Sequence, residues 1–128
     1  MMRIYVAALV FGLLGVNPVS AQDTSIDCDN AMTQREMNIC SYEDYMAADR
    51  ALNETYAWAL ARTQEWGGGL KEALRAAQRA WIPYRDAACH TEGQLHDGGS
   101  IRPLIENICK ATLTTRRTQD MRATYEQF

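Results

Sequence analysis

Apolar side chains recur every three or four residues along most of the chain, and the strict alternation that is typical of strands is absent. Three stretches show helical spacing: residues 46–60, residues 70–92, and residues from about 100 to 122. The positions that define the three faces are Met46, Asp49, Leu52, Asn53, Tyr56 and Leu60; Leu70, Leu74, Ala77, Trp81, Tyr84 and Ala88; and Ile101, Leu104, Ile105 and Ile108. The pattern predicts an all-α protein.

Capping signals place the first helix boundaries. Thr33 to Glu36 has the capping-box spacing and predicts a short helix that runs to Cys40. Residues 41–44 (SYED) predict either a second helix start or a kink in one continuous helix. Both alternatives remain open from the sequence.

Glycines divide the rest of the chain. Gly67-Gly68-Gly69 ends one helix and permits a tight reversal, so the helices on either side are expected to pack as a long antiparallel hairpin. Residues 93–99 (GQLHDGG loop, starting at Gly93) precede Ser100, which is expected to cap the last helix. We therefore expect a small disulfide-stabilised bundle of about four helices.

Residues 1–21 have the features of a cleaved signal peptide. A basic residue precedes a compact apolar run over residues 4–16, and small residues occupy positions 19–21. The run is too short to remain as a membrane span, and no cysteine for a lipid anchor follows the expected cleavage point. We expect residues 22–128 to form one helical domain that is soluble in the periplasm or secreted.

The expected mature chain is acidic. Removal of Arg3 leaves 12 Lys/Arg against 16 Asp/Glu, a net charge of about −4. This balance argues against nucleic-acid binding, because phosphates would be repelled. It favours a cationic partner, since complementary fields speed encounter. The sequence does not indicate an oligomeric state.

Four cysteines, Cys28, Cys40, Cys89 and Cys109, indicate two disulfides in an exported domain. A zinc site is the competing reading, but the chain has no C-x-x-C pair, and His90 and His96 do not form a ligand spacing. Of the three possible connectivities we expect Cys28 with Cys40 and Cys89 with Cys109, because each pair flanks a turn or a helix start.

The stretch from Ala77 to Cys89 concentrates residues that could react. On a helix Trp81, Arg85 and Cys89 share a side near Gln78, and antiparallel packing would place Asp49 and Asn53 opposite. A catalytic reading makes Asp49 an acid or base. A guanidinium beside it would instead lower its pKa, which favours a structural ion pair.

Residues 96–100 (HDGGS) form the loop with the most site-like chemistry. Its glycines could present backbone N–H groups to an anion or to a partner's carboxylate. The same residues also suit an ordinary turn and helix cap. The candidate partner-binding residues are His96, Asp97, Gly98, Gly99 and Ser100.

The sequence contains no recognisable set of catalytic residues. Ser100 lacks a G-x-S-x-G context, the cysteines are expected to be oxidised, and no second carboxylate accompanies Asp49. We expect no catalytic residues, no metal and no cofactor.

The combined motifs resemble a known family. These are Thr33-Gln34-Arg35-Glu36-Met37-Asn38 between two cysteines; Ala48-Asp49-x-x-Leu52-Asn53-x-x-Tyr56; Ala77-Gln78-x-Ala80-Trp81-x-x-Tyr84-Arg85-Asp86-x-x-Cys89; and Gly98-Gly99-Ser100 before Cys109 and Arg116. Together they resemble the N-terminal domain of the LprI-type lysozyme-inhibitor family, from Cys28 to about Arg122. Pro83 departs from the pattern.

The resemblance implies a small disulfide-bonded helical domain that inhibits lysozyme. The namesake type carries a lipid anchor, which is not expected here. Our leading hypothesis is a periplasmic protein that occludes the active site of a cationic lysozyme. The second is an envelope interaction or structural module without lysozyme inhibition, and a hydrolase ranks last.

Overall fold

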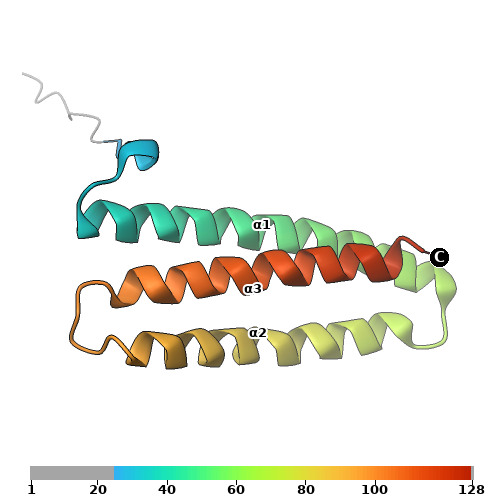
Figure 1. Ribbon diagram of the computed structural model, residues 1–128. Coiled ribbons are helices and arrows are strands. Elements are labelled where there is room, and N and C mark those ends of the chain that lie inside the picture. Colours follow the sequence, from blue (N-terminus) through green and yellow to red (C-terminus); the bar gives the residue numbers. More distant parts are fainter. Residues whose placement is uncertain (1–24, 128) are drawn as a thin grey trace, which may run out of the picture.

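Three helices and one short 3₁₀ turn make up the protein in the computed structural model, which describes residues 25–127 (Figure 1). The expected signal peptide, residues 1–21, lies outside the described residues. The elements, in chain order, are η1 (Cys28–Asn30), α1 (Gln34–Trp66), α2 (Leu70–Gln94) and α3 (Arg102–Tyr125). No strand occurs in residues 25–127, so the all-α prediction is confirmed.

Helix α1 is one continuous helix of 33 residues, and the prediction of about four helices is wrong by one. Its start is the predicted capping box: the Thr33 hydroxyl accepts from the Glu36 N–H, and the Glu36 carboxylate accepts from the Thr33 N–H. Ser41 starts no second helix, because its hydroxyl donates to the Asn38 carbonyl inside the first one, at 2.9 Å.

The glycine turn reverses the chain between α1 and α2. Gly67, Gly68 and Gly69 have φ angles of 68°, 65° and 78°, a region that residues with a Cβ rarely adopt. Figure 1 shows α3 between α1 and α2, and α3 makes most of the interhelical contacts. The antiparallel α1–α2 pair is thus joined chiefly through α3.

Helix α2 buries only part of the predicted apolar side: Leu74 is buried and Trp81 packs against the core. Its buried residues are spaced four or seven positions apart: Leu74, Gln78, Arg85, Cys89 and Gly93. The predicted inward residues Leu70, Ala77 and Tyr84 are exposed. The reason is that Gln78 and Arg85 have hydrogen-bond partners on the other helices, so polar side chains occupy the inner face. Pro83 lies within α2 on its exposed side.

Two predicted boundaries around the α2–α3 connection are also corrected. Helix α2 continues through Gly93 to Gln94, and α3 begins at Arg102 with Ile101, not Ser100, in the cap position. The residues before α3 close a turn, with the Arg102 N–H donating to the Gly99 carbonyl at 3.2 Å. The Ser100 side chain therefore does not cap α3.

The hydrophobic core is small and lies toward the glycine-turn half of the bundle. Leu52 and Ala59 of α1 meet Leu74 of α2 and Met121 of α3, all at most 3% exposed. Thr63 and Thr114 are also fully buried. The Thr63 hydroxyl donates to carbonyls of its own helix, so its burial leaves no unsatisfied donor.

Two disulfides fasten the other half. The Cys28–Cys40 bond ties η1 to α1, and the Cys89–Cys109 bond joins α2 to α3. This is the predicted connectivity, and residues 25–127 contain no free cysteine. The start of α1 lies at the same end of the bundle as the α2–α3 loop (Figure 1), and the bonded cysteines belong to chain segments near that end.

Candidate functional site

Arg85 is the centre of a polar cluster that links all three helices. Its side chain is 6% exposed. The guanidinium donates to Asp49 Oδ1 of α1 at 3.2 Å, to Asp86 Oδ1 of α2 at 2.9 Å and to Thr114 Oγ1 of α3 at 3.3 Å. It also stacks on Tyr45, with Cζ 5.2 Å from the ring centroid. The predicted Asp49–Arg85 pair is therefore present.

The electrostatics of this cluster favour a permanent charge. Burial acts to lower the pKa of the Arg85 guanidinium, but hydrogen bonding to Asp86 and Asp49 outweighs burial and leaves that pKa raised. Burial also raises the pKa of the neighbouring Tyr45 phenol. Both groups keep their protonated form at neutral pH. Arg85 thus acts as a fixed cation that joins the three helices.

The other signature residues surround this cluster. Asn53 donates to Asp49 Oδ2 at 3.2 Å, and the Trp81 ring centroid lies 5.3 Å from Arg85 Cζ. The Gln78 amide oxygen accepts from Arg117 of α3 at 3.2 Å, a partner that the sequence did not indicate. Tyr56 is partly buried against the core. Arg117 was missed because the helical spacing gives no register for α3 relative to α2.

The α2–α3 loop presents the predicted partner-binding residues at one end of the bundle. Asp97, Gly98, Gly99 and Ser100 are exposed, and His96 is half-buried. Within the loop, the N–H groups of His96, Asp97 and Gly99 donate to carbonyls of residues 93, 94 and 96. The loop is thus a hydrogen-bonded turn, and these three groups are not available as anion donors.

An ion-pair network fixes this loop to the start of α3. Arg102 donates to Asp97 Oδ1 at 2.6 Å and to Glu106 Oε1 at 2.9 Å. His90 Nδ1 lies 3.7 Å from the same Glu106 oxygen. The Glu106 side chain packs over Gly93, where any Cβ would overlap it. The loop therefore has one defined shape.

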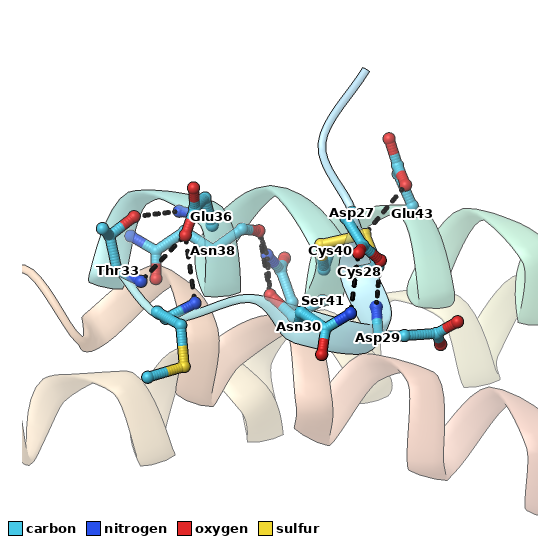
Figure 2. Close-up of a disulfide and its surroundings, with 12 residues drawn as sticks. Asp27, Cys28, Asp29, Asn30, Thr33, Glu36, Asn38, Cys40, Ser41 and Glu43 are labelled. Carbon is cyan, nitrogen blue, oxygen red and sulfur yellow. Dashed lines mark hydrogen bonds between the residues drawn. A yellow bond between two sulfur atoms is a disulfide. The ribbon is translucent and has the colours of Figure 1, made fainter. Parts of the chain in front are cut away.

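The same end of the bundle is tied to α1. Asn38 Nδ2 donates to the Ser100 carbonyl at 2.9 Å, and Asn107 Nδ2 donates to Ser41 Oγ at 3.1 Å. Figure 2 shows the adjoining Cys28–Cys40 disulfide, with Asp27 accepting from Asn30 and from the Asp29 N–H. Sequence reasoning missed these asparagines, since amides on half-exposed helix faces carry no distinctive signal.

Three further properties bear on function. Over residues 25–127 no group of three or more His, Cys, Asp or Glu side chains is placed to hold a metal ion. In the same part of the chain, each helix is too short or too polar to cross a membrane. The two disulfides are typical of proteins from oxidising compartments outside the cytosol.

Comparison with known families settles the relationship that the motifs indicate. The sequence model of the family described as "Lysozyme inhibitor LprI" matches residues 27–121. This chain belongs to the LprI family. The match includes both disulfides, the Arg85 cluster and the α2–α3 loop, so the features described above fall within the LprI unit.

One curated relative shares nearly the whole chain. An uncharacterized protein of Rhizobium meliloti (strain 1021) is 40% identical over 135 aligned positions, which cover 98% of this chain and 97% of the relative. No solved structure matches this LprI protein.

Proposed function

We propose that this protein binds lysozyme and inhibits it by occluding its active site. The observation that carries the proposal is the LprI family match over residues 27–121, because the family is described as a lysozyme inhibitor. The described residues also form a small, disulfide-fastened bundle without a metal cluster, which suits a binding protein.

We assign the inhibitory contact to the loop of His96, Asp97, Gly98, Gly99 and Ser100. The loop projects at one end of the bundle and is held by Arg102 and Asn38. A preformed loop binds more tightly than a mobile one, because less conformational entropy is lost on association. The ordered turn implies that the contact uses loop side chains and exposed carbonyls more than free N–H groups.

We place the protein in the periplasm or outside the cell. Two disulfides and the sequence features of residues 1–21 support this location. The net charge of −3 for the full chain supports a cationic partner, since animal lysozymes are strongly basic.

The test is the rate of peptidoglycan lysis by several purified lysozymes, measured with and without the disulfide-bonded protein. We expect saturable inhibition of at least one cationic lysozyme. The proposal is contradicted if the protein at micromolar concentration neither binds nor inhibits any of these lysozymes. The alternative hypothesis, an envelope interaction module without lysozyme inhibition, would then be favoured.

A loop variant locates the contact. Residues 96–100 are replaced by a neutral linker of equal length, and the variant is first checked for an unchanged melting temperature. We expect inhibition to be lost. Full inhibition by a folded loop variant would assign the contact to the helix faces instead.

A further inference from the structure

The chain before α1 forms a second exposed segment beside the α2–α3 loop. Residues 27–33, here called the clip, are held to α1 by the Cys28–Cys40 disulfide. The Met32 N–H donates to Glu36 Oε2 at 3.0 Å, which fixes the clip to the first turn of α1 (Figure 2). The same part of α1 carries Asn38, which binds the loop at the Ser100 carbonyl. Clip and loop are thus anchored to neighbouring points.

Large apolar side chains stand exposed on both segments. Met32 of the clip is 85% exposed, Leu95 at the start of the loop is 83% exposed, and Ile101 at its end is 37% exposed. These two side chains, Met32 and Leu95, are the most exposed large hydrophobic residues in the described chain. Apolar groups in a structurally fixed surface are typical of the anchors of protein interfaces.

Acidic residues predominate in the clip and the start of α1, the part of the chain that carries Met32. The stretch from residue 27 to residue 44 contains one basic residue, Arg35, and several carboxylates. The carboxylates are Asp27, Asp29, Glu36, Glu43 and Asp44. On the loop side the exposed Asp97 carboxylate is balanced by Arg102, so the unpaired acidic charge lies on the clip side. Apolar anchors with a polar, charged rim match the usual anatomy of an interface, and this rim complements a basic partner.

We propose that the clip and the loop form one docking surface for a cationic protein, with Met32 and Leu95 as its apolar anchors and the clip carboxylates as its steering charges. The inference rests on the proposed function, in that the cationic protein is the inhibited lysozyme. It adds the clip to the contact and gives the Cys28–Cys40 disulfide a binding role: it holds Met32 beside the loop.

The experiment measures association and dissociation rates of the disulfide-bonded protein on an immobilised animal lysozyme of the c type. Met32→Ser and Leu95→Ser are each expected to raise Kd at least tenfold, mainly through faster dissociation. Tyr84→Ser is the matched control, because Tyr84 is 62% exposed on α2 outside the surface. It is expected to leave Kd unchanged. Melting temperatures confirm that all three variants fold.

A second pair of variants tests whether the clip carboxylates speed association. Asp29→Asn is expected to lower the association rate about twofold at low salt, with little change in the dissociation rate and a smaller effect at high salt. The control is Asp120→Asn, an exposed carboxylate on α3 toward the opposite end. Equal rates for these two variants would argue against steering by the clip.

The outcomes separate the two proposals. Lysozyme binding that the Met32 and Leu95 variants leave intact overturns the docking surface and leaves the proposed function standing. Binding weakened as strongly by Tyr84→Ser also overturns it. No binding of lysozyme by the unaltered protein contradicts the proposed function, and the docking surface with it.

Discussion

Arg85 joins the three helices through one side chain. Its guanidinium contacts Asp49 on α1, Asp86 on α2 and Thr114 on α3. Asp49 is 30% exposed, so water solvates part of its charge, whereas the Arg85 side chain is 6% exposed. The stabilisation therefore comes from a buried cation that donates three hydrogen bonds, and less from a buried ion pair.

Arg85→Ala is expected to lower the free energy of unfolding by about 3 kcal/mol, because it leaves a cavity and removes the partner of the buried Thr114 hydroxyl. Asp49→Asn is expected to cost less, since Asp86 still balances Arg85. Urea unfolding measures both. Arg79→Ala, on the exposed side of α2, is the control, with a change within about 0.5 kcal/mol. An Arg85→Ala variant that unfolds like the control would contradict the cluster's role.

A substitution at Gly93 tests how closely α2 packs against α3. Alanine would add about 0.5–1 kcal/mol of helix propensity, but its Cβ would overlap the Glu106 side chain. We expect Gly93→Ala to lower the melting temperature by displacing Glu106 from Arg102. In the double variant Gly93→Ala, Glu106→Ala the clash is absent, so the alanine should then be neutral or stabilising. A destabilising Gly93→Ala in both backgrounds would contradict this explanation.

At the scale of elements, hydrophobic spacing predicted that the helices exist but not how they face one another. The capping box, the triple-glycine turn and the disulfide pairs are local signals, and all three are confirmed. For α2 the apolar spacing alone was insufficient: Leu70, Ala77 and Tyr84 are exposed, whereas the polar Gln78 and Arg85 are buried against partners on α3 and α1.

Some contacts of the candidate site could likewise be predicted from the sequence, and others could not. The Asp49–Arg85 pair was predictable, because both residues lie on facing sides of antiparallel helices. The role of Asn38 in holding the loop was not, since its partner is a backbone carbonyl 62 residues away. Main-chain partners of this kind leave no pattern in the side-chain sequence.

The capping box makes the start of α1 sensitive to acid. Backbone N–H groups of Thr33 and Met32 donate to Glu36 and lower the pKa of its carboxyl below the ordinary 4.5. Its stabilising contribution is therefore present above pH 4.5 and is lost as the pH falls through the lowered folded-state value.

The measurement compares melting temperatures of the wild type and Glu36→Gln from pH 7 to pH 2. We expect the wild type to be more stable at neutral pH and the difference to shrink below pH 4.5. Thr33→Ala, which removes the reciprocal cap, should cost about 1 kcal/mol. A difference between wild type and Glu36→Gln that does not change with pH would contradict the assignment.

At the scale of the whole molecule, the two disulfides have different neighbours. Cys89 and Cys109 join α2 to α3 and are buried, at 0% and 7% exposure. Cys28 is exposed on the clip. Loss of the Cys89–Cys109 bond loosens the packing of α2 against α3. Loss of the Cys28–Cys40 bond frees only the clip.

We expect the double variant Cys89→Ser, Cys109→Ser to lose about 3 kcal/mol or more of unfolding free energy. Cys28→Ser with Cys40→Ser should lose less stability. It should nevertheless weaken lysozyme binding, because Met32 is no longer held beside the loop. Thermal melts and binding rates on the same samples measure both effects. A clip variant with unaltered binding would argue against the docking surface.

Charge is unevenly distributed along the bundle. Carboxylates dominate the clip and the start of α1, whereas the first half of α2 carries Lys71, Arg75 and Arg79. The start of α1 and the start of α2 lie at opposite ends of the bundle, so these two groups of charges are separated along its length (Figure 1). A basic partner is therefore drawn to the clip and loop end before any contact forms.

The central position of α3 has a consequence for the order in which the protein can fold. Helix α3 is the last to be synthesised, yet α1 and α2 pack mainly against it. A growing chain that has reached residue 100 holds Leu52, Ala59 and Leu74 but lacks Met121, the core residue between them. The α1–α2 hairpin alone has no completed core, so stable packing of the three helices requires α3.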